Sequence, residues 1–181
     1  MNNNVKTFKD IKQLTRDGSW EADFHIDFFI DFIDKKCKTQ GLDIDPEFQR
    51  DHVWTEQQQI NFVEFFLQGG KTGRVIYLNY PSFMKNEKKS GYNDFVLVDG
   101  KQRLQAIRRF YNNEIMAFGR TCKELFPNDR FMLAQTMKIN INTLQTYAEV
   151  LKWYLDMNSG GTIHTPEELN KVRHLLAKEQ K

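Results

Sequence analysis

A chain of 181 residues with 40% apolar and 28% charged side chains can fill one hydrophobic core, which excludes collagen-like, low-complexity and disordered proteins. No apolar run approaches the roughly 18 residues of a membrane helix, and the polar first residues do not resemble a signal peptide, so we expect a cytoplasmic protein without membrane contact. The net charge of +2 conceals a basic middle: residues 71–130 carry 12 basic and 6 acidic side chains, whereas residues 1–70 carry 8 and 13. A localised anion site would explain this excess, and so would solvated surface lysines.

The first third of the chain predicts two helices joined by a loop. Residues 24–36 place phenylalanines and isoleucines on one side of a helix and charged residues on the other. Residues 41–50 contain a proline and are typical of an extended or looped segment. A second helix starts where Thr55 and Gln58 form a capping box, and it ends at a pair of glycines.

The middle third predicts a strand, a long loop, a second strand and a helix. Residues 74–79 are rich in β-branched and aromatic side chains, whereas residues 82–94 are polar. Residues 95–98 are apolar on both faces, as in a strand buried in the middle of a sheet. A turn of two residues then leads directly into a helix over 101–112.

The last third predicts two strands and two helices. Residues 115–118 favour a short strand, and residues 137–142 alternate as a half-exposed strand does. We expect a helix from a Thr143 cap to about residue 158, and a final helix that starts from a Thr165 cap. The whole chain therefore predicts a single α/β domain, with about five helices around a small mixed sheet.

The junction between the second strand and its helix is the strongest candidate for a functional site. A buried strand that turns through Gly100 into a helix leaves backbone N–H groups and the positive end of the helix dipole at one point, where phosphate binds well. Arg103 in the first turn can add a bidentate contact to phosphate oxygens. Asp99 can bind magnesium, position a water or cap the helix. Asp-Gly is also a common turn, and an arginine in a helix usually lies on the surface.

Neither the cysteines nor the histidines of the chain indicate a metal centre. Cys37 and Cys122 belong to no metal-binding cluster, so we expect ordinary thiols rather than a disulfide framework or a zinc site. The four histidines have no metal-ligand spacing.

Three motifs in order resemble the DGQQR-motif subgroup of the ParB/sulfiredoxin-like superfamily, which forms the N-terminal domain of GmrSD-type restriction enzymes. Residues 98–104, Val-Asp-Gly-Lys-Gln-Arg-Leu, are similar to the DGQQR motif itself. Residues 45–54 are similar to the (F/Y)QR...W signature, and residues 154–169 to the F..LN..G..L...EL ending. The resemblance covers about residues 42–172, and three ordered motifs are more specific than any one alone.

The resemblance implies a ParB/sulfiredoxin-like fold that binds a nucleotide, and an NTP hydrolase activity coupled to DNA binding or cleavage. In this scheme Gly100, Lys101 and Arg103 bind the nucleotide phosphates. Asp99, Gln102 and Arg103 are the expected catalytic residues: Asp99 holds Mg²⁺ or water, Gln102 orients a water or the base, and Arg103 stabilises developing charge. Position 101 departs from the subgroup because it holds Lys instead of Gln. This lysine favours an anion but not a metal, and the absence of a thiol there excludes sulfiredoxin chemistry.

Matched residues outside the DGQQR-like motif are weaker candidates for the same site. Gln49 and Arg50 lie in a loop that can fold over the motif and bind nucleotide or DNA, or can simply tie down the loop. Trp54 is more typical of a core anchor than of a base-stacking platform. Asn158 can form a polar turn near the site or a helix C-cap.

Three functions therefore stay open at the level of the sequence, and one of them is DNA cleavage that needs no NTP. The first is a magnesium-dependent NTP hydrolase, with or without nuclease activity, that acts with or on DNA in a phage, plasmid or defence system. The alternative is a non-catalytic regulator or inhibitor that uses the same fold to bind DNA or a protein partner. The sequence does not decide the oligomeric state, and a homodimer is one option.

Overall fold

The structure is a computed structural model that describes residues 7, 20–49, 51, 53–83, 92, 94–128, 135–158 and 166–179. Its centre is a four-stranded mixed sheet in the order β1-β4-β2-β3. The strands are β1 (Trp20–His25), β2 (Val75–Asn79), β3 (Val96–Asp99) and β4 (Thr136–Asn142). β4 pairs antiparallel with β1 and parallel with β2, and β2 pairs antiparallel with β3.

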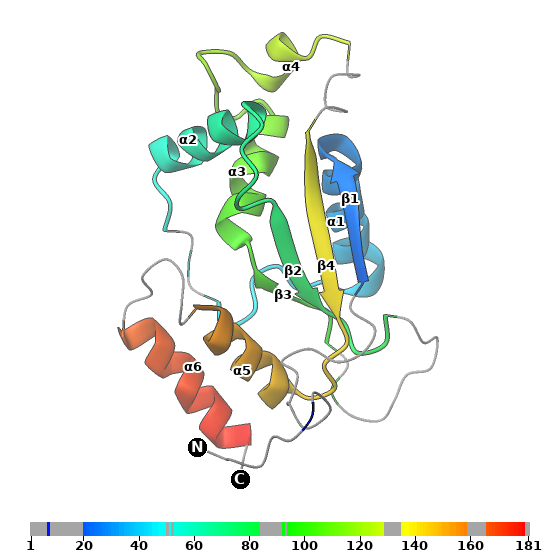
Figure 1. Cartoon of the computed structure of the whole chain (residues 1–181), viewed down its shortest axis with the longest axis vertical. Helices are drawn as coiled ribbons and strands as arrows, with labels where there is room; N and C mark the ends of the chain where they lie inside the picture. The colour runs from blue at the N-terminus through cyan, green and yellow to red at the C-terminus, as the bar shows by residue number, and fades with distance from the viewer. Residues whose placement is uncertain are drawn as a thin grey trace.

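The described part of the chain contains six helices, which cover both faces of this sheet (Figure 1). They are α1 (Ile26–Gln40), α2 (Glu56–Leu67), α3 (Lys101–Tyr111), the single turn α4 (Cys122–Leu125), α5 (Tyr147–Asn158) and α6 (Pro166–Glu179). The expected α/β class, with a small mixed sheet and about five helices, is confirmed. No described helix is both long enough and apolar enough to cross a membrane.

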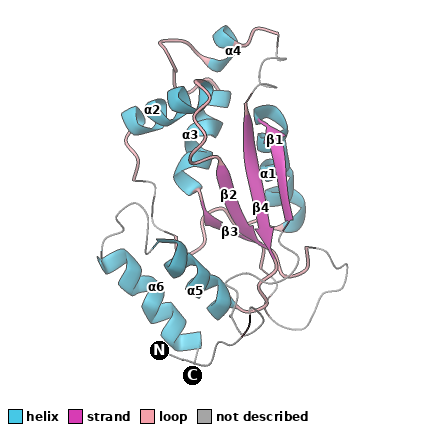
Figure 2. Cartoon of the chain, viewed as in Figure 1, coloured by secondary structure: helices cyan, strands magenta, loops and turns pink. Residues whose placement is uncertain are grey.

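The helices pack in layers against the sheet (Figure 2), and two hydrophobic clusters hold these layers together. The larger cluster joins α1, α2 and α3 to alternate residues of β2 and β4, including Ile76 and Ile139. The smaller cluster joins α5 and α6 to Val96 and Val98 of β3. Because Leu97 lies between Val96 and Val98 and belongs to the larger cluster, β3 contributes to both clusters.

The expectation that β3 lies in the middle of the sheet is wrong. β3 is an edge strand, and it is apolar on both faces because helices pack on both of its faces. Its outer edge is partly covered by Asp43, whose N–H donates to Phe95 O at 2.9 Å and whose carbonyl accepts from Leu97 N–H at 2.8 Å. Burial on two faces therefore does not require strand neighbours on both edges.

The N-terminal strand is the largest difference from the sequence prediction. The expected helix over 24–36 begins at Ile26 instead, and Phe24 belongs to β1. β1 pairs along its whole length with β4, for example Ala22 with Ile139. The apolar residues of β1 are followed at once by those of α1. The sequence therefore does not show where the two-residue spacing of a strand gives way to the 3.6-residue spacing of a helix.

The region from residue 115 to β4 also differs. Residues 115–118 form no strand, because only an isolated bridge joins Ala117 to Arg120, and α4 follows from a Thr121 cap. β4 is not half-exposed: it is an interior strand, and Asn140 on its second face is buried and donates to Glu21 at 2.8 Å. Polar side chains at alternate positions thus do not establish exposure, because a neighbouring strand can bond to such a side chain in the interior, as Glu21 bonds to the Asn140 amide nitrogen.

Helix caps are partly as predicted. The Thr55–Gln58 capping box at the start of α2 is confirmed. The cap of α5 is Thr146 instead of Thr143, since Thr146 Oγ1 accepts from Glu149 N–H and Glu149 Oε2 accepts from Thr146 N–H. Thr165 lies outside the described residues.

Both cysteines are free thiols, as expected. Burial raises the pKa of the Cys37 thiol, which disfavours its reactive thiolate form.

Candidate functional site

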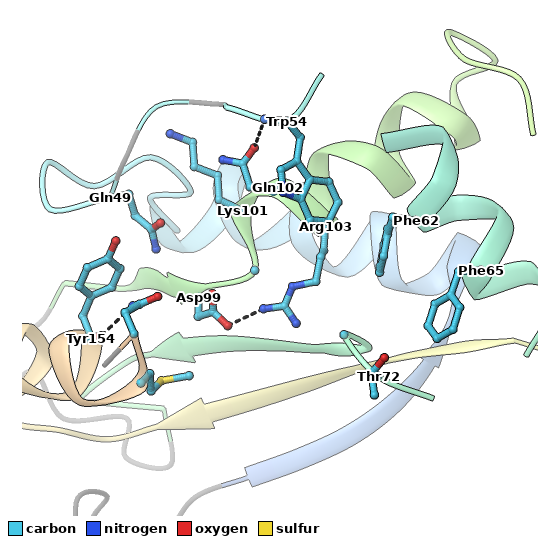
Figure 3. A pocket seen from close by; sticks show the side chains of 14 residues that line it. Gln49, Trp54, Phe62, Phe65, Thr72, Asp99, Lys101, Gln102, Arg103 and Tyr154 are labelled. Atoms are coloured by element: carbon cyan, nitrogen blue, oxygen red, sulfur yellow. Dashed lines mark hydrogen bonds and ion pairs between the residues drawn. The ribbon is translucent and has the colours of Figure 1, made fainter. Parts of the chain in front are cut away.

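A cavity of about 420 Å³ lies where β3 passes into α3. Its walls come from segments far apart in the chain: the loop after α1, α2, the turn before β2, the β3–α3 junction and the end of α5 (Figure 3). This volume falls in the range of small-molecule sites. The structure therefore brings the DGQQR-like motif to an open pocket.

Gly100 determines how β3 turns into α3. Its φ of 108° is a left-handed conformation that favours glycine, and a Cβ there would lie 2.4 Å from Ile76 Cδ1. As the residue preceding α3, it provides no side-chain cap for the amides of the first turn. Those amides and the positive helix end consequently lie beside the cavity.

Arg103 lines the cavity and is held by two contacts. Its guanidinium pairs with Asp99 (Figure 3). It also donates to Val75 O at 2.9 Å. The side chain is only 17% exposed, so its position is fixed by packing as well as by charge. Asp99 offsets part of the positive charge but leaves the cavity beside Gly100 open.

The Gln102 side chain is committed to the loop that precedes α2. Its Oε1 accepts from Val53 N–H and Trp54 N–H, each at 3.1 Å, and its Nε2 donates to Asp51 O at 3.1 Å. Gln102 is 8% exposed and lines the cavity. It therefore positions Trp54, and orienting a water or a base would cost these bonds.

The Lys101 side chain is directed away from the centre of the site. Its ammonium group pairs with Asp45, and in Figure 3 it points away from the Asp99–Arg103 pair. Lys101 nevertheless borders the cavity. The positive charge of Lys101 thus lies beside Asp45 and not at the predicted phosphate position beside Gly100.

Gln49 joins the loop after α1 to the β3 strand. Its Nε2 donates to Val98 O at 2.7 Å and to Leu97 O at 3.2 Å, and the side chain is 8% exposed. It borders the cavity, so the structure places it at the site while giving it a structural role. Arg50 lies outside the described residues.

Asn158 closes the far end of the cavity from the last turn of α5. Its Nδ2 donates to Tyr154 O at 2.7 Å within the same helix. The side chain therefore binds its own helix end, as in the C-cap interpretation, and also borders the cavity as the resemblance implies.

A sequence profile described as the N-terminal domain of the GmrSD restriction endonuclease matches residues 27–135. This chain belongs to that family. The matched part of the GmrSD N-terminal domain contains Gln49 and the turn from Asp99 to Arg103, but not Asn158. Comparison with curated proteins and with solved structures found no match. The ParB/sulfiredoxin-like superfamily and the third motif therefore stay predictions.

This GmrSD-family site also has an aromatic wall that sequence reasoning largely missed. Trp54 lines the same cavity from the loop before α2, and Phe62 and Phe65 line it from α2 itself (Figure 3). The Trp54 and Phe62 rings lie 5.5 Å apart between centroids. Only Trp54 was a candidate from the sequence, because phenylalanines at helical spacing are most simply core residues.

The donors of the site do not fit a magnesium ion held by the protein alone. Asp99 is the one carboxylate among the described residues that line the cavity, and it already pairs with Arg103. The described residues contain no group of three or more His, Cys, Asp or Glu side chains that could hold a metal. Since Mg²⁺ takes six oxygen ligands, a magnesium role for Asp99 stays a prediction that requires oxygens from a bound phosphate chain and water.

Proposed function

We propose that this domain binds a nucleoside triphosphate with its phosphates beside Gly100, and hydrolyses it in a restriction system that acts on DNA. The observation that carries the proposal is the open cavity at the start of α3, where Arg103 is already held in position. The family membership supports the restriction setting. The phosphate-binding part rests on the site geometry itself.

Arg103 has N–H donors available for a phosphate in addition to its two existing contacts. A guanidinium carries five N–H donors, and the contacts with Asp99 and Val75 use two of them. The other three have no partner among the described residues. A phosphate in the cavity can take these donors together with the first-turn amides of α3, which supports anion binding at this point.

Hydrolysis makes a further demand on Asp99. Its Oδ2 pairs with Arg103 in the structure, so the whole carboxylate becomes available to an attacking water only when phosphate oxygens draw the guanidinium away from it. We therefore propose that binding of the phosphate chain and release of Asp99 are linked. Gln102 supports this arrangement indirectly, by positioning the loop that carries Trp54.

One experiment tests the binding proposal directly. We expect Arg103→Ala to weaken ATP binding about tenfold or more in isothermal titration calorimetry, because a charge-assisted bidentate contact is lost. Arg108→Ala is the matched control, since Arg108 lies on the same helix, pairs with Asp34 and does not line this cavity. ATP binding that is equal in all three proteins would contradict the proposal.

The stability of these variants must be measured alongside binding. Arg103 also bonds to Val75 O, so Arg103→Ala removes one contact between α3 and β2. Arg103→Lys keeps the charge and serves as a second variant. If the loss of ATP binding in these variants is fully explained by the smaller fraction of folded protein that their lower Tm implies, Arg103 is structural and the phosphate site is not supported.

A non-catalytic regulator is the second candidate function, and one observation favours it. The side chains of Lys101 and Gln102 are engaged by Asp45 and the 51–54 loop, so two motif residues are not aimed at a reacting phosphate. Phosphate release should be measured with each NTP and magnesium, with and without DNA. Nucleotide or DNA binding without any release of phosphate would favour the regulator.

A further inference from the structure

The aromatic wall formed by Trp54, Phe62 and Phe65 is partly exposed. Phe65 is 43% exposed although it borders the cavity, whereas Tyr154 at the opposite end is 3% exposed and packs edge-on against Phe48 at 5.2 Å between centroids. Trp54 and Phe62 are half-buried. A planar group that enters the cavity can therefore stack at the α2 end but not on Tyr154.

The exposed phenylalanine is held in place by the backbone beneath it. A Cβ at Gly70 would lie 2.3 Å from Phe65 ring atoms, so the ring rests directly on the glycine. The Gly70 N–H donates to Phe65 O at 2.9 Å, and the Gly70 carbonyl accepts from Arg74 Nε. The Gly70 backbone therefore supports one side of the ring before any ligand binds, which restricts the motion of the ring and lowers the entropic cost of stacking on it.

The neighbouring ring is supported in the same way, and close to the charged centre. A Cβ at Gly73 would lie 3.2 Å from Phe62 Cε2 and 3.4 Å from Arg103 Cδ. The absence of a side chain at Gly73 therefore lets the aromatic wall and the Arg103 side chain approach one another. One cavity joins an apolar, ring-lined end to a cationic centre.

We propose that Phe65 and Phe62 form a stacking subsite for the base of the nucleotide whose phosphates lie beside Gly100. This inference rests on the proposed function. It adds a subsite for the base, which is the part of a nucleotide that a bare polyphosphate lacks. The rings of Phe62 and Phe65 carry no hydrogen-bonding group, so this subsite recognises the flat face of a base rather than its edge. Purines bind more tightly than pyrimidines because their stacking area is larger, and adenine and guanine bind alike.

The test compares ATP with inorganic tripolyphosphate on the full chain by isothermal titration calorimetry. We expect the unmodified protein to bind ATP about tenfold or more tightly than tripolyphosphate. Phe65→Ala removes most of this advantage, a loss of about 5- to 100-fold for ATP, and leaves tripolyphosphate binding within about twofold. Phe65→Tyr retains the aromatic ring and the advantage.

Phe28→Ala is the matched control, because Phe28 is an exposed phenylalanine, 57% accessible, on α1 outside the cavity lining. It changes neither affinity. Gly70→Ala keeps Phe65 but displaces its ring, so it lowers ATP affinity and spares tripolyphosphate as Phe65→Ala does. Gly70→Ala changes the position of the Phe65 ring, whereas Phe65→Ala removes the ring. The two variants together therefore test whether the position of the ring matters.

Each other outcome has a definite meaning. Equal affinity of the unmodified protein for ATP and tripolyphosphate overturns the stacking subsite and leaves the phosphate site standing. Equal weakening of both ligands by Phe65→Ala also overturns it, because the ring would then only support the cavity. Binding of neither ligand to the unmodified protein refutes the proposed function itself.

Discussion

Gly100 shows how one residue determines the geometry of the turn beside the cavity. Its backbone conformation has a positive φ, and the Ile76 side chain occupies the space that a Cβ would need. A substitution there meets two separate costs, backbone strain and a steric clash. Gly41 provides a natural comparison, since its φ is +66° but nothing lies within 4 Å of its Cβ position.

We predict that Gly100→Ala lowers the free energy of unfolding by more than the roughly 1–2 kcal/mol that left-handed strain alone costs at Gly41. Urea denaturation of both alanine variants checks this. Adding Ile76→Val to Gly100→Ala should recover part of the loss if the clash contributes. Equal destabilisation at both glycines would mean that the contact with Ile76 has no energetic effect.

Asp99 is the second residue whose role is decided locally, by its pairing with Arg103. We predict that Asp99→Asn strengthens tripolyphosphate binding without magnesium by a few-fold, because the competing negative charge is removed. The same variant should lose phosphate release from ATP if Asp99 orients the water. Calorimetry in EDTA and in magnesium separates the roles.

A different outcome would assign Asp99 to the metal. If Asp99→Asn weakens binding only when magnesium is present, the carboxylate acts as a ligand of a phosphate-bound ion. If it weakens binding equally in both conditions, its main function is to hold Arg103 in place.

At the scale of elements, the start of α5 depends on a capping box that the sequence pattern misplaces. Thr146 and Glu149 exchange side-chain and backbone hydrogen bonds, with Thr146 Oγ1 to Glu149 N at 3.2 Å. The intervening residues are tied to β2 instead: Asn79 accepts from Leu144 N–H at 2.8 Å and donates to its carbonyl at 3.2 Å. This tertiary clamp delays the helix beyond Thr143.

We predict that Thr146→Ala destabilises the domain by about 1 kcal/mol, whereas Thr143→Ala has a clearly smaller effect. Chemical denaturation followed by circular dichroism measures both. The two threonines are three residues apart in one segment, so composition and helix propensity hardly differ between the variants. A larger loss at Thr143 would restore the cap that the sequence pattern favours.

At the scale of the whole molecule, β3 couples the two hydrophobic clusters. Leu97 faces the cluster of α1, α2 and α3, while Val96 and Val98 face that of α5 and α6. The smaller cluster lies largely outside residues 27–135, the range of the family match, yet it shares a strand with the larger one. We therefore expect both clusters to unfold together as one domain.

We predict a single transition when Leu151→Ala and Leu104→Ala, one substitution in each cluster, are unfolded by urea. Both side chains are at least 98% buried, so each variant should lose about 2–5 kcal/mol and shift the same transition. Circular dichroism and tryptophan fluorescence should give one midpoint. An early separate transition in Leu151→Ala alone would show that α5 and α6 form an independent unit.

Much of the local structure follows from short segments. The α2 capping box, β2, and the passage from strand through Gly100 into α3 were all predicted, because each depends on contacts between residues close in the chain. The same local logic identified Gly100 and Arg103 as the centre of the candidate site, and the pocket lies there. The sequence by itself therefore determined the class of fold and the turn from strand to helix beside which the cavity lies.

Only the tertiary structure decided which side chains of that site face the cavity and which are held by other residues. Lys101 pairs with Asp45, Gln102 holds the 51–54 loop, and Phe65 faces the cavity because α2 packs beside α3. These orientations depend on segments that are distant in the chain and meet only when the core forms. The side-chain pattern of one segment specifies which of its faces is apolar, but not which partner will cover that face or leave it open to a ligand.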